Sequence, residues 1–298
     1  MQWPKTDFSQ KSVDLSEIRS GGPGKDGIPA IDDPHFQAIK KVTEAKLYGA
    51  EEPVIGLVLN GDARAYPLQI LMWHEIVNDV VGGVPVTVTY CPLCNSAIVF
   101  DRRVAGRVLD FGVSGNLRKS DMVMYDRQTE SWWQQFLGEG IVGQMTGTRL
   151  KMLPARVEAF ERFAERAPGG KVLVPPSDSG RAYGMNPYMG YDTLPRPFLY
   201  SGDMPKGIKP LAYVLAVGED AWSLDLIKRE KRIEKGNLVI TWVPGQNSAL
   251  DTSDITEGRD IGNVVVQRRT AKGLVDEVHD LTFAFVFHAF KKGRNIYK

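Results

Sequence analysis

The chain is 298 residues long, and its 43% hydrophobic and 24% charged content is ordinary for a soluble globular protein. A formal net charge of +1 gives no electrostatic reason to expect nucleic acid or an anionic membrane surface as a partner. No apolar run approaches the length of a membrane span, and Met1–Gln10 is polar, so we expect neither a transmembrane segment nor a signal peptide within this chain.

The first fifty residues predict an extended arm followed by a helix. Residues 1–31 are polar and rich in glycine, which is typical of an arm that lies across a domain. A helix is expected over residues 33–48, because Asp33 can cap it, Pro34 suits its first turn and Gly49 can end it.

A hairpin and a second helix are expected next. The runs 54–59 and 63–66 are rich in strand-forming residues, and Asn60-Gly61-Asp62 between them favours a tight turn. Pro67 suits the first turn of a short helix, which we expect over residues 67–77.

That second helix carries the segment His74-Glu75-Ile76-Val77-Asn78. His74 and Asn78 are four residues apart and would share one helical face. The pattern is similar to the H-E-x-x-H motif, but asparagine stands where the second histidine would be, which excludes a zinc-protease interpretation. His74 is then either a structural residue or a metal ligand, and a nearby cysteine pair that lacks partners favours the ligand role.

The two cysteines of the chain, Cys91 and Cys94, lie in the run Cys-Pro-Leu-Cys. Strand-forming residues precede them at 86–90 and follow them at 97–100, so the pair is expected on a tight turn between two strands. Thioredoxin-like proteins place this motif at the start of a helix, whereas a turn between strands is typical of a metal-binding knuckle. A metal would need further ligands, and a disulfide, a redox pair or two buried thiols are the alternatives.

The rest of the first half predicts more strands and one helix. Strands are expected at 107–113, 122–127 and 131–136, and an amphipathic helix over residues 155–167. Residues 175–210 contain seven prolines and several tyrosines, which indicates a long irregular excursion at the surface.

The second half repeats the first in degenerate form. Residues 86–97 (VTVTYCPLCNSA) align with residues 238–249 (LVITWVPGQNSA), with valine and glutamine in place of the two cysteines. A turn that folds without thiols in one copy favours a chemical role for the thiols of the other. No clear counterpart of the segment around His74 is recognisable in the second copy.

Five motifs resemble, in order, those of domain of unknown function family 3179. They are residues 21–32, 63–67, 74–79, the Tyr-Cys-Pro-Leu-Cys run at 90–94, and Asp-Met-Val-Met-Tyr-Asp-Arg at 121–127. The family usually has glycine after the second cysteine, where this chain has Asn95; both residue types tolerate positive φ. The resemblance implies an exported, periplasmic or secreted prokaryotic protein whose signal has been trimmed, and it implies no settled activity.

The sequence therefore predicts a β-rich α+β protein with two degenerate β-units, arising from an internal duplication, and a few peripheral helices. Its expected parts are an arm and helix at 1–50, a first β-unit at 51–174, and an irregular loop with a cysteine-free β-unit at 175–298, together forming one compact domain.

The predicted function is transition-metal binding, with copper or zinc held by Cys91, Cys94 and His74. A metal-dependent oxidoreductase acting on a small molecule or peptide is one activity that such a site would serve. A metal-free thiol–disulfide protein and a non-enzymatic binding module are the alternatives. Candidates for a catalytic role are Glu75, Asn78, Asp79 and Arg127.

Overall fold

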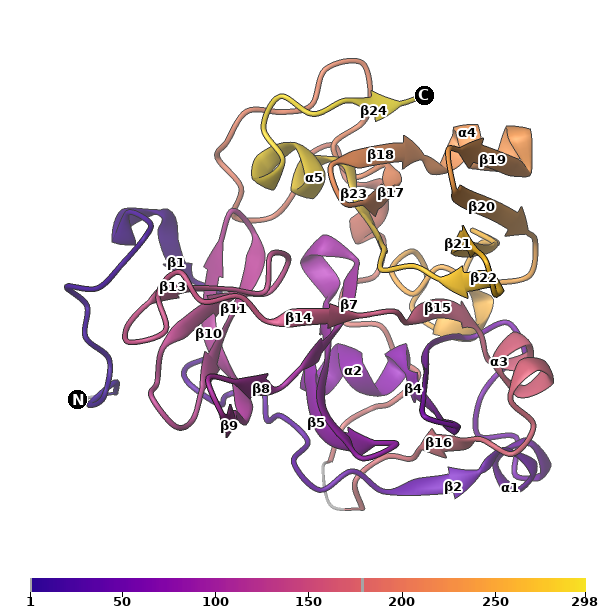
Figure 1. The fold of residues 1–298 in the computed structure, drawn as a ribbon, viewed down its shortest axis with the longest axis horizontal. Helices are drawn as coiled ribbons and strands as arrows, with labels where there is room; N and C mark the ends of the chain where they lie inside the picture. Colours follow the sequence, from indigo (N-terminus) through magenta and orange to yellow (C-terminus); the bar gives the residue numbers. More distant parts are fainter. Residues whose placement is uncertain (1, 178–179) are drawn as a thin grey trace.

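Several twisted antiparallel and mixed sheets make up most of the regular structure of this protein, and short helices follow directly on strands (Figure 1). This arrangement is seen in a computed structural model, which describes residues 2–177 and 180–298. The protein is thus a β-rich α+β fold, as the sequence predicts. No helix in the described part of the chain is both long and apolar enough to cross a membrane.

Two sheets of the first half contain the predicted hairpin and the cysteine turn. One has the order β15-β3-β4-β16-β2, formed by β2 (Phe36–Ala38), β3 (Pro53–Leu59), β4 (Asp62–Pro67), β15 (Arg156–Ala159) and β16 (Lys171–Leu173). The other has the order β14-β7-β6-β5, formed by β5 (Ile76–Val81), β6 (Val84–Cys91), β7 (Ser96–Asp101) and β14 (Lys151–Leu153). The predicted hairpin turn is confirmed, with Asn60 and Gly61 both at positive φ.

The three predicted helices exist, but each is shorter than expected. They are α1 (Ile39–Glu44), α2 (Leu68–His74) and α3 (Phe160–Arg166). Residues 36–38 and 156–159, expected to be helical, instead pair as strands with β16 and β3. Helix α2 ends at His74, because Glu75 turns to φ 57° and Ile76 begins β5. Tertiary strand pairing overrides the local helical preference at these ends.

A third sheet of the first half has the order β1-β10-β11-β12-β13. Its strands are β1 (Ile18–Ser20), β10 (Phe111–Arg118), β11 (Asp121–Asp126), β12 (Trp132–Gln134) and β13 (Glu139–Val142). The one-turn helix η1 (Leu15–Glu17) precedes it, and a small hairpin of β8 (Arg103–Val104) and β9 (Arg107–Val108) lies beside it. The N-terminal arm packs on this sheet, where Trp3 contacts Tyr125 and Trp132 edge to face.

The second half contains two further sheets. One has the order β23-β17-β18-β24, formed by β17 (Tyr213–Val217), β18 (Asp220–Ser223), β23 (Asp280–Phe283) and β24 (Ile296–Tyr297). The other has the order β19-β20-β21-β22, formed by β19 (Arg232–Lys235), β20 (Leu238–Val243), β21 (Asn263–Thr270) and β22 (Gly273–Asp276). Helices α4 (Leu224–Glu230) and α5 (Ala284–Phe290) were not predicted, and η4 (Ile255–Glu257) is a single turn.

The order hairpin, helix, hairpin occurs in both halves, so helix α4 occupies the place in the second half that α2 has in the first. In the order of elements, the segment around His74 therefore does have a counterpart, which is helix α4. Asn247-Ser248-Ala249, in contrast, lies in a loop rather than in a strand like Ser96-Ala97. The internal duplication itself remains a prediction.

Strand β23 of the second half lies against the cysteine turn of the first. Asn95 donates a side-chain hydrogen bond to the Leu281 carbonyl at 2.8 Å, and Ser96 donates one to Asp280 at 2.6 Å. Most buried apolar residues of both halves form one continuous cluster, and a smaller second cluster lies on the third sheet beneath the N-terminal arm. Between the halves, the described residues of 174–212 form a long excursion whose regular element is the single turn η3 (Tyr191–Thr193), as the proline content predicts.

Candidate metal centre

The cysteine turn is built as the sequence predicts, between strands β6 and β7. Cys91 ends β6, the single turn η2 (Pro92–Cys94) follows, and Asn95 adopts the left-handed conformation at φ 47° before β7 begins. Both cysteines are free thiols, and both are buried. No helix follows the motif, so the environment that activates thioredoxin-like thiols is absent from this turn.

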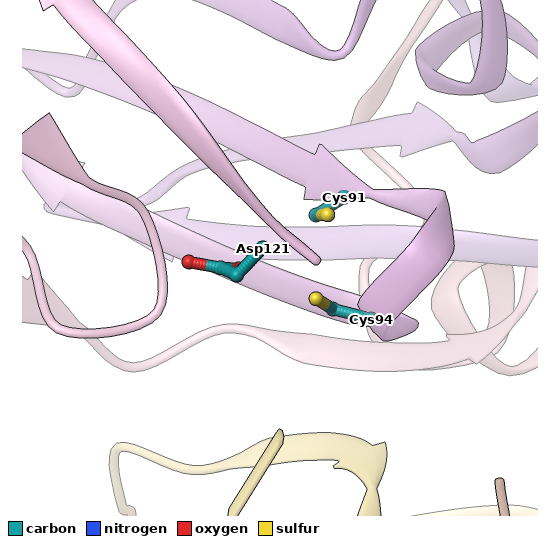
Figure 2. A group of neighbouring side chains, drawn as sticks. All are labelled: Cys91, Cys94 and Asp121. Atoms are coloured by element: carbon teal, nitrogen blue, oxygen red, sulfur yellow. The ribbon is translucent and has the colours of Figure 1, made fainter. Parts of the chain in front are cut away.

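A carboxylate from another strand joins the two thiols. The Sγ atoms of Cys91 and Cys94 and a carboxylate oxygen of Asp121 all lie within 4.8 Å of one another (Figure 2). Asp121 is the first residue of β11, and it comes from the third sheet rather than from the sheet that carries the cysteines. All three residues are buried.

The hairpin that delivers Asp121 has an unusual turn. Lys119 and Ser120 are the two residues between β10 and β11, and both have positive φ, at 55° and 66°. Such turns normally hold glycine or asparagine, because other side chains are strained there. The turn brings the Ser120 carbonyl to the site, where it accepts a hydrogen bond from Cys94 Sγ at 3.5 Å. Strained backbone of this kind is often found at functional sites.

The Asp121 carboxylate has one satisfied and one unsatisfied oxygen. Oδ1 accepts hydrogen bonds from Gln134 Nε2 at 2.5 Å and from the Phe136 backbone N–H at 3.1 Å. Oδ2 is fully buried and has no hydrogen-bond partner among the described residues. Burial raises the pKa of Asp121 to about 7, although the hydrogen bonds from the Phe136 N–H and Gln134 and the interaction with the Cys94 thiol act in the opposite direction. An unpaired buried oxygen of this kind is costly unless something binds it.

The thiols and a second carboxylate share this environment. Burial raises the pKa of both cysteines above the usual range, and the negative charge of Asp121 adds to the effect. Glu75, at the end of α2, is buried, and burial together with the Asp121 charge raises its pKa to about 8. No lysine or arginine charge is among the main influences on these four pKa values. The site therefore concentrates acidic groups in a low-dielectric interior.

The irregular excursion covers this site with phenol rings. The Glu75 and Cys91 charges are among the causes, after burial, that raise the pKa of Tyr188. Tyr191 is likewise buried, and its hydroxyl accepts a hydrogen bond from the Phe198 backbone N–H at 3.2 Å. The Phe198 carbonyl in turn accepts from Ser120 Oγ at 2.5 Å, which ties the excursion to the strained turn beside Asp121.

One known protein family matches nearly the whole chain. Residues 25–293 match the family described as Protein of unknown function (DUF3179). The chain belongs to the DUF3179 family. Neither the curated proteins nor the solved structures gave a match. The resemblance seen in the sequence motifs is thus confirmed.

The cluster of ligand atoms in this DUF3179 protein does not include His74. Its Nδ1 lies 2.8 Å from the Pro29 carbonyl, and its Nε2 lies 2.7 Å from the Tyr183 hydroxyl. Burial lowers the pKa of His74, which favours the neutral ring at pH 7. Both ring nitrogens thus already contact protein groups, so a ligand role for His74 stays a prediction that needs a different arrangement of this side chain.

The other candidates fall into two groups. Glu75 lies near the cluster, because its backbone carbonyl accepts a hydrogen bond at 2.8 Å from the N–H of Tyr90, the residue before Cys91. Three further residues take part in polar contacts elsewhere: Asn78 with Asp32 and the Phe111 backbone, Asp79 with Arg64 and Tyr66, and Arg127 with Asp32. Their catalytic roles remain untested predictions.

Sequence reasoning did not assign Asp121 to the site. Asp121 opens the last of the five DUF3179 motifs, which was the one available signal. The motif alone does not say that its first residue faces the cysteines, because strand β11 belongs to a different sheet.

Proposed function

We propose that this protein binds a divalent transition metal through Cys91, Cys94 and Asp121. The observation that carries the proposal is the Oδ2 atom of Asp121, which is buried and unpaired in a carboxylate that lies within 4.8 Å of two free thiols. Two thiolates and one carboxylate supply three protein ligands, and a fourth position remains for water, substrate or Glu75.

Electrostatics supports a cation in this place. Burying an ionised carboxylate or thiolate without a compensating positive charge is costly, so these groups hold their protons instead. A divalent metal would replace those protons and offset the combined negative charge of Cys91, Cys94 and Asp121. Raised pKa values of Cys91, Cys94 and Asp121 are expected of a buried metal site that holds protons in place of the metal.

The donor set favours zinc over copper. Copper(I) prefers soft sulfur ligands throughout, whereas the carboxylate oxygen of Asp121 is a hard ligand that zinc accepts beside thiolates. Zinc has no redox chemistry of its own. An oxidoreductase activity at this site would therefore require copper or iron as the metal. With zinc, an open fourth position would polarise a carbonyl or activate a water molecule.

Elemental analysis of protein purified without a chelator or an affinity tag tests this proposal. We expect about one equivalent of zinc per chain, and loss of that metal in Cys91→Ser and in Asp121→Asn. His74→Ala separates the two ligand sets, since it keeps the metal if Asp121 is the third ligand. Asp203→Asn, an exposed residue on the excursion, is the matched control and keeps the metal as well.

The thiol–disulfide alternative gives a different outcome in the same preparation. Thiol titration after anaerobic denaturation and removal of metal should give two free thiols per chain. Finding no thiols together with no stoichiometric metal would overturn the metal proposal in favour of a redox or structural disulfide. Two free thiols in a protein that does not bind added zinc would overturn the metal proposal in favour of a non-enzymatic binding module.

A further inference from the structure

A second candidate site lies where the two halves of the chain meet. It is a hollow of about 560 Å³ lined by residues of β7, β14, β17, β23 and α5. Figure 1 shows where these strands and this helix lie in the fold. Its volume is within the usual range for sites that bind small molecules, which often lie at the boundary between structural units. Cys91, Cys94 and Asp121 are not among the residues that line it.

The hollow has an apolar lining from both units. The rings of Phe136 and Phe290 meet with their centroids 5.5 Å apart, and Ile98 and Met152 extend the apolar surface. Aromatic and aliphatic lining of this kind favours a ligand with a hydrocarbon or aromatic body.

The rim of the hollow carries four basic residues, namely Arg149, Lys291, Lys292 and Arg294. Lys292 is exposed and has no acidic partner in the described part of the chain. Arg149 is 75% exposed and pairs with Glu139, which lies outside the hollow.

The acidic residues of the lining are already engaged. Glu219 is paired with both Lys291 at 2.5 Å and Arg294 at 2.9 Å. Glu277 is paired with Arg268, and Asp280 is hydrogen bonded to Ser96 and to the Ala97 backbone. Two cations therefore share one carboxylate at Glu219, and one further cation, Lys292, has none.

From this lining we infer that the hollow binds a small organic anion: a carboxylate or sulfonate attached to an aromatic or branched hydrocarbon body. The body packs on Phe136, Phe290 and Met152, and the acidic group lies at the basic rim near Lys292. The inference does not depend on the metal proposal, because the two sites share no lining residue.

A pair of fluorescent probes of the same shape tests the inference. 8-Anilinonaphthalene-1-sulfonate carries the apolar body and the negative charge, whereas N-phenyl-1-naphthylamine carries the body alone. We expect the sulfonate to bind the native protein with one-to-one stoichiometry and the neutral probe to bind at least about fivefold more weakly. Equal binding of the two probes, or no binding of the sulfonate, would overturn the inference.

Charge reversals on the surface locate the bound sulfonate without disturbing the fold. Lys292→Glu should lower the affinity for the sulfonate probe by about 3- to 10-fold, and Arg149→Glu should lower it as well. Lys272→Glu is the matched control, because Lys272 is an exposed lysine that does not line the hollow, and it should leave the affinity unchanged. Equal effects of Lys292→Glu and Lys272→Glu would place the probe elsewhere and reject the site.

Discussion

Replacing Asp121 by asparagine should stabilise the metal-free protein at alkaline pH while it abolishes metal binding. Asparagine keeps the shape of the side chain, and its oxygen still accepts the hydrogen bonds from Gln134 and the Phe136 N–H. The change removes the ionisable oxygen that is buried without a partner. A residue kept for metal binding at the expense of stability is expected to behave in this way.

The size of the effect follows from the two pKa values of Asp121. The carboxyl has an ordinary pKa of 3.8 in an unfolded chain and about 7 in the folded protein. The folded state binds the proton more tightly, so the stability of the wild type falls as the pH rises from about 4 to about 7. This loss amounts to about 4 kcal/mol at pH 8 and about 2 kcal/mol at pH 5. The advantage of Asp121→Asn should therefore grow by about 2–3 kcal/mol between pH 5 and pH 8.

Urea denaturation measures this difference when tryptophan fluorescence is followed with chelator and reductant present. A constant packing effect of the substitution cancels in the comparison of the two pH values. Asp79→Asn is a contrasting control, because it removes a buried carboxylate that is paired with Arg64 at 2.8 Å and should destabilise the protein. An Asp121→Asn protein whose stability relative to the wild type is the same at pH 5 and pH 8 would refute the reasoning.

Three further predictions concern the site and its supports. Zinc binding at pH 7 should release about two to three protons per ion, because Cys91, Cys94 and Asp121 must deprotonate. Titration calorimetry in two buffers of different ionisation enthalpy measures the number of protons released. A number near zero would contradict thiolate ligation. Lys119→Asn should be more stable than Lys119→Ala by up to about 1 kcal/mol. Both variants lose the Lys119 contacts with the Ala289 carbonyl and the Phe290 ring, and asparagine tolerates positive φ at this turn better than alanine. Equal stability of the two variants in urea would argue against backbone strain. Arg166→Met should lower stability by about 3 kcal/mol in the same assay, since it removes the guanidinium that is paired with the buried Glu158 carboxylate.

The cysteine turn could be predicted from the sequence because its determinants are local. Strand-forming residues on both sides, proline after the first cysteine and Asn95 after the second specify two strands and a left-handed residue between them. The hairpin at Asn60-Gly61 is predictable for the same reason.

Helix lengths were less predictable, since they depend on which strands the flanking residues meet. Residues 36–38 and 156–159 carry apolar residues that fit a helix equally well, and pairing with β16 and β3 makes them strands. Helices α4 and α5 each begin directly after a strand, at Leu224 and Ala284. Ser223 caps α4 and was an available signal, whereas Phe283 before α5 gives none.

The composition of the candidate site was decided by tertiary structure. The sequence by itself determined that two thiols face one side of a turn, because Cys91 and Cys94 are close along the chain. It did not determine the third group, because Asp121 reaches the thiols through a different hairpin, and the turn at Lys119 and Ser120 lacks the glycine that would announce it. A histidine near in sequence, His74, was the natural candidate, yet the fold directs its ring to the N-terminal arm and the excursion instead. Nearness in sequence fixes the geometry of a turn, whereas the packing of separate sheets fixes which side chains meet across it.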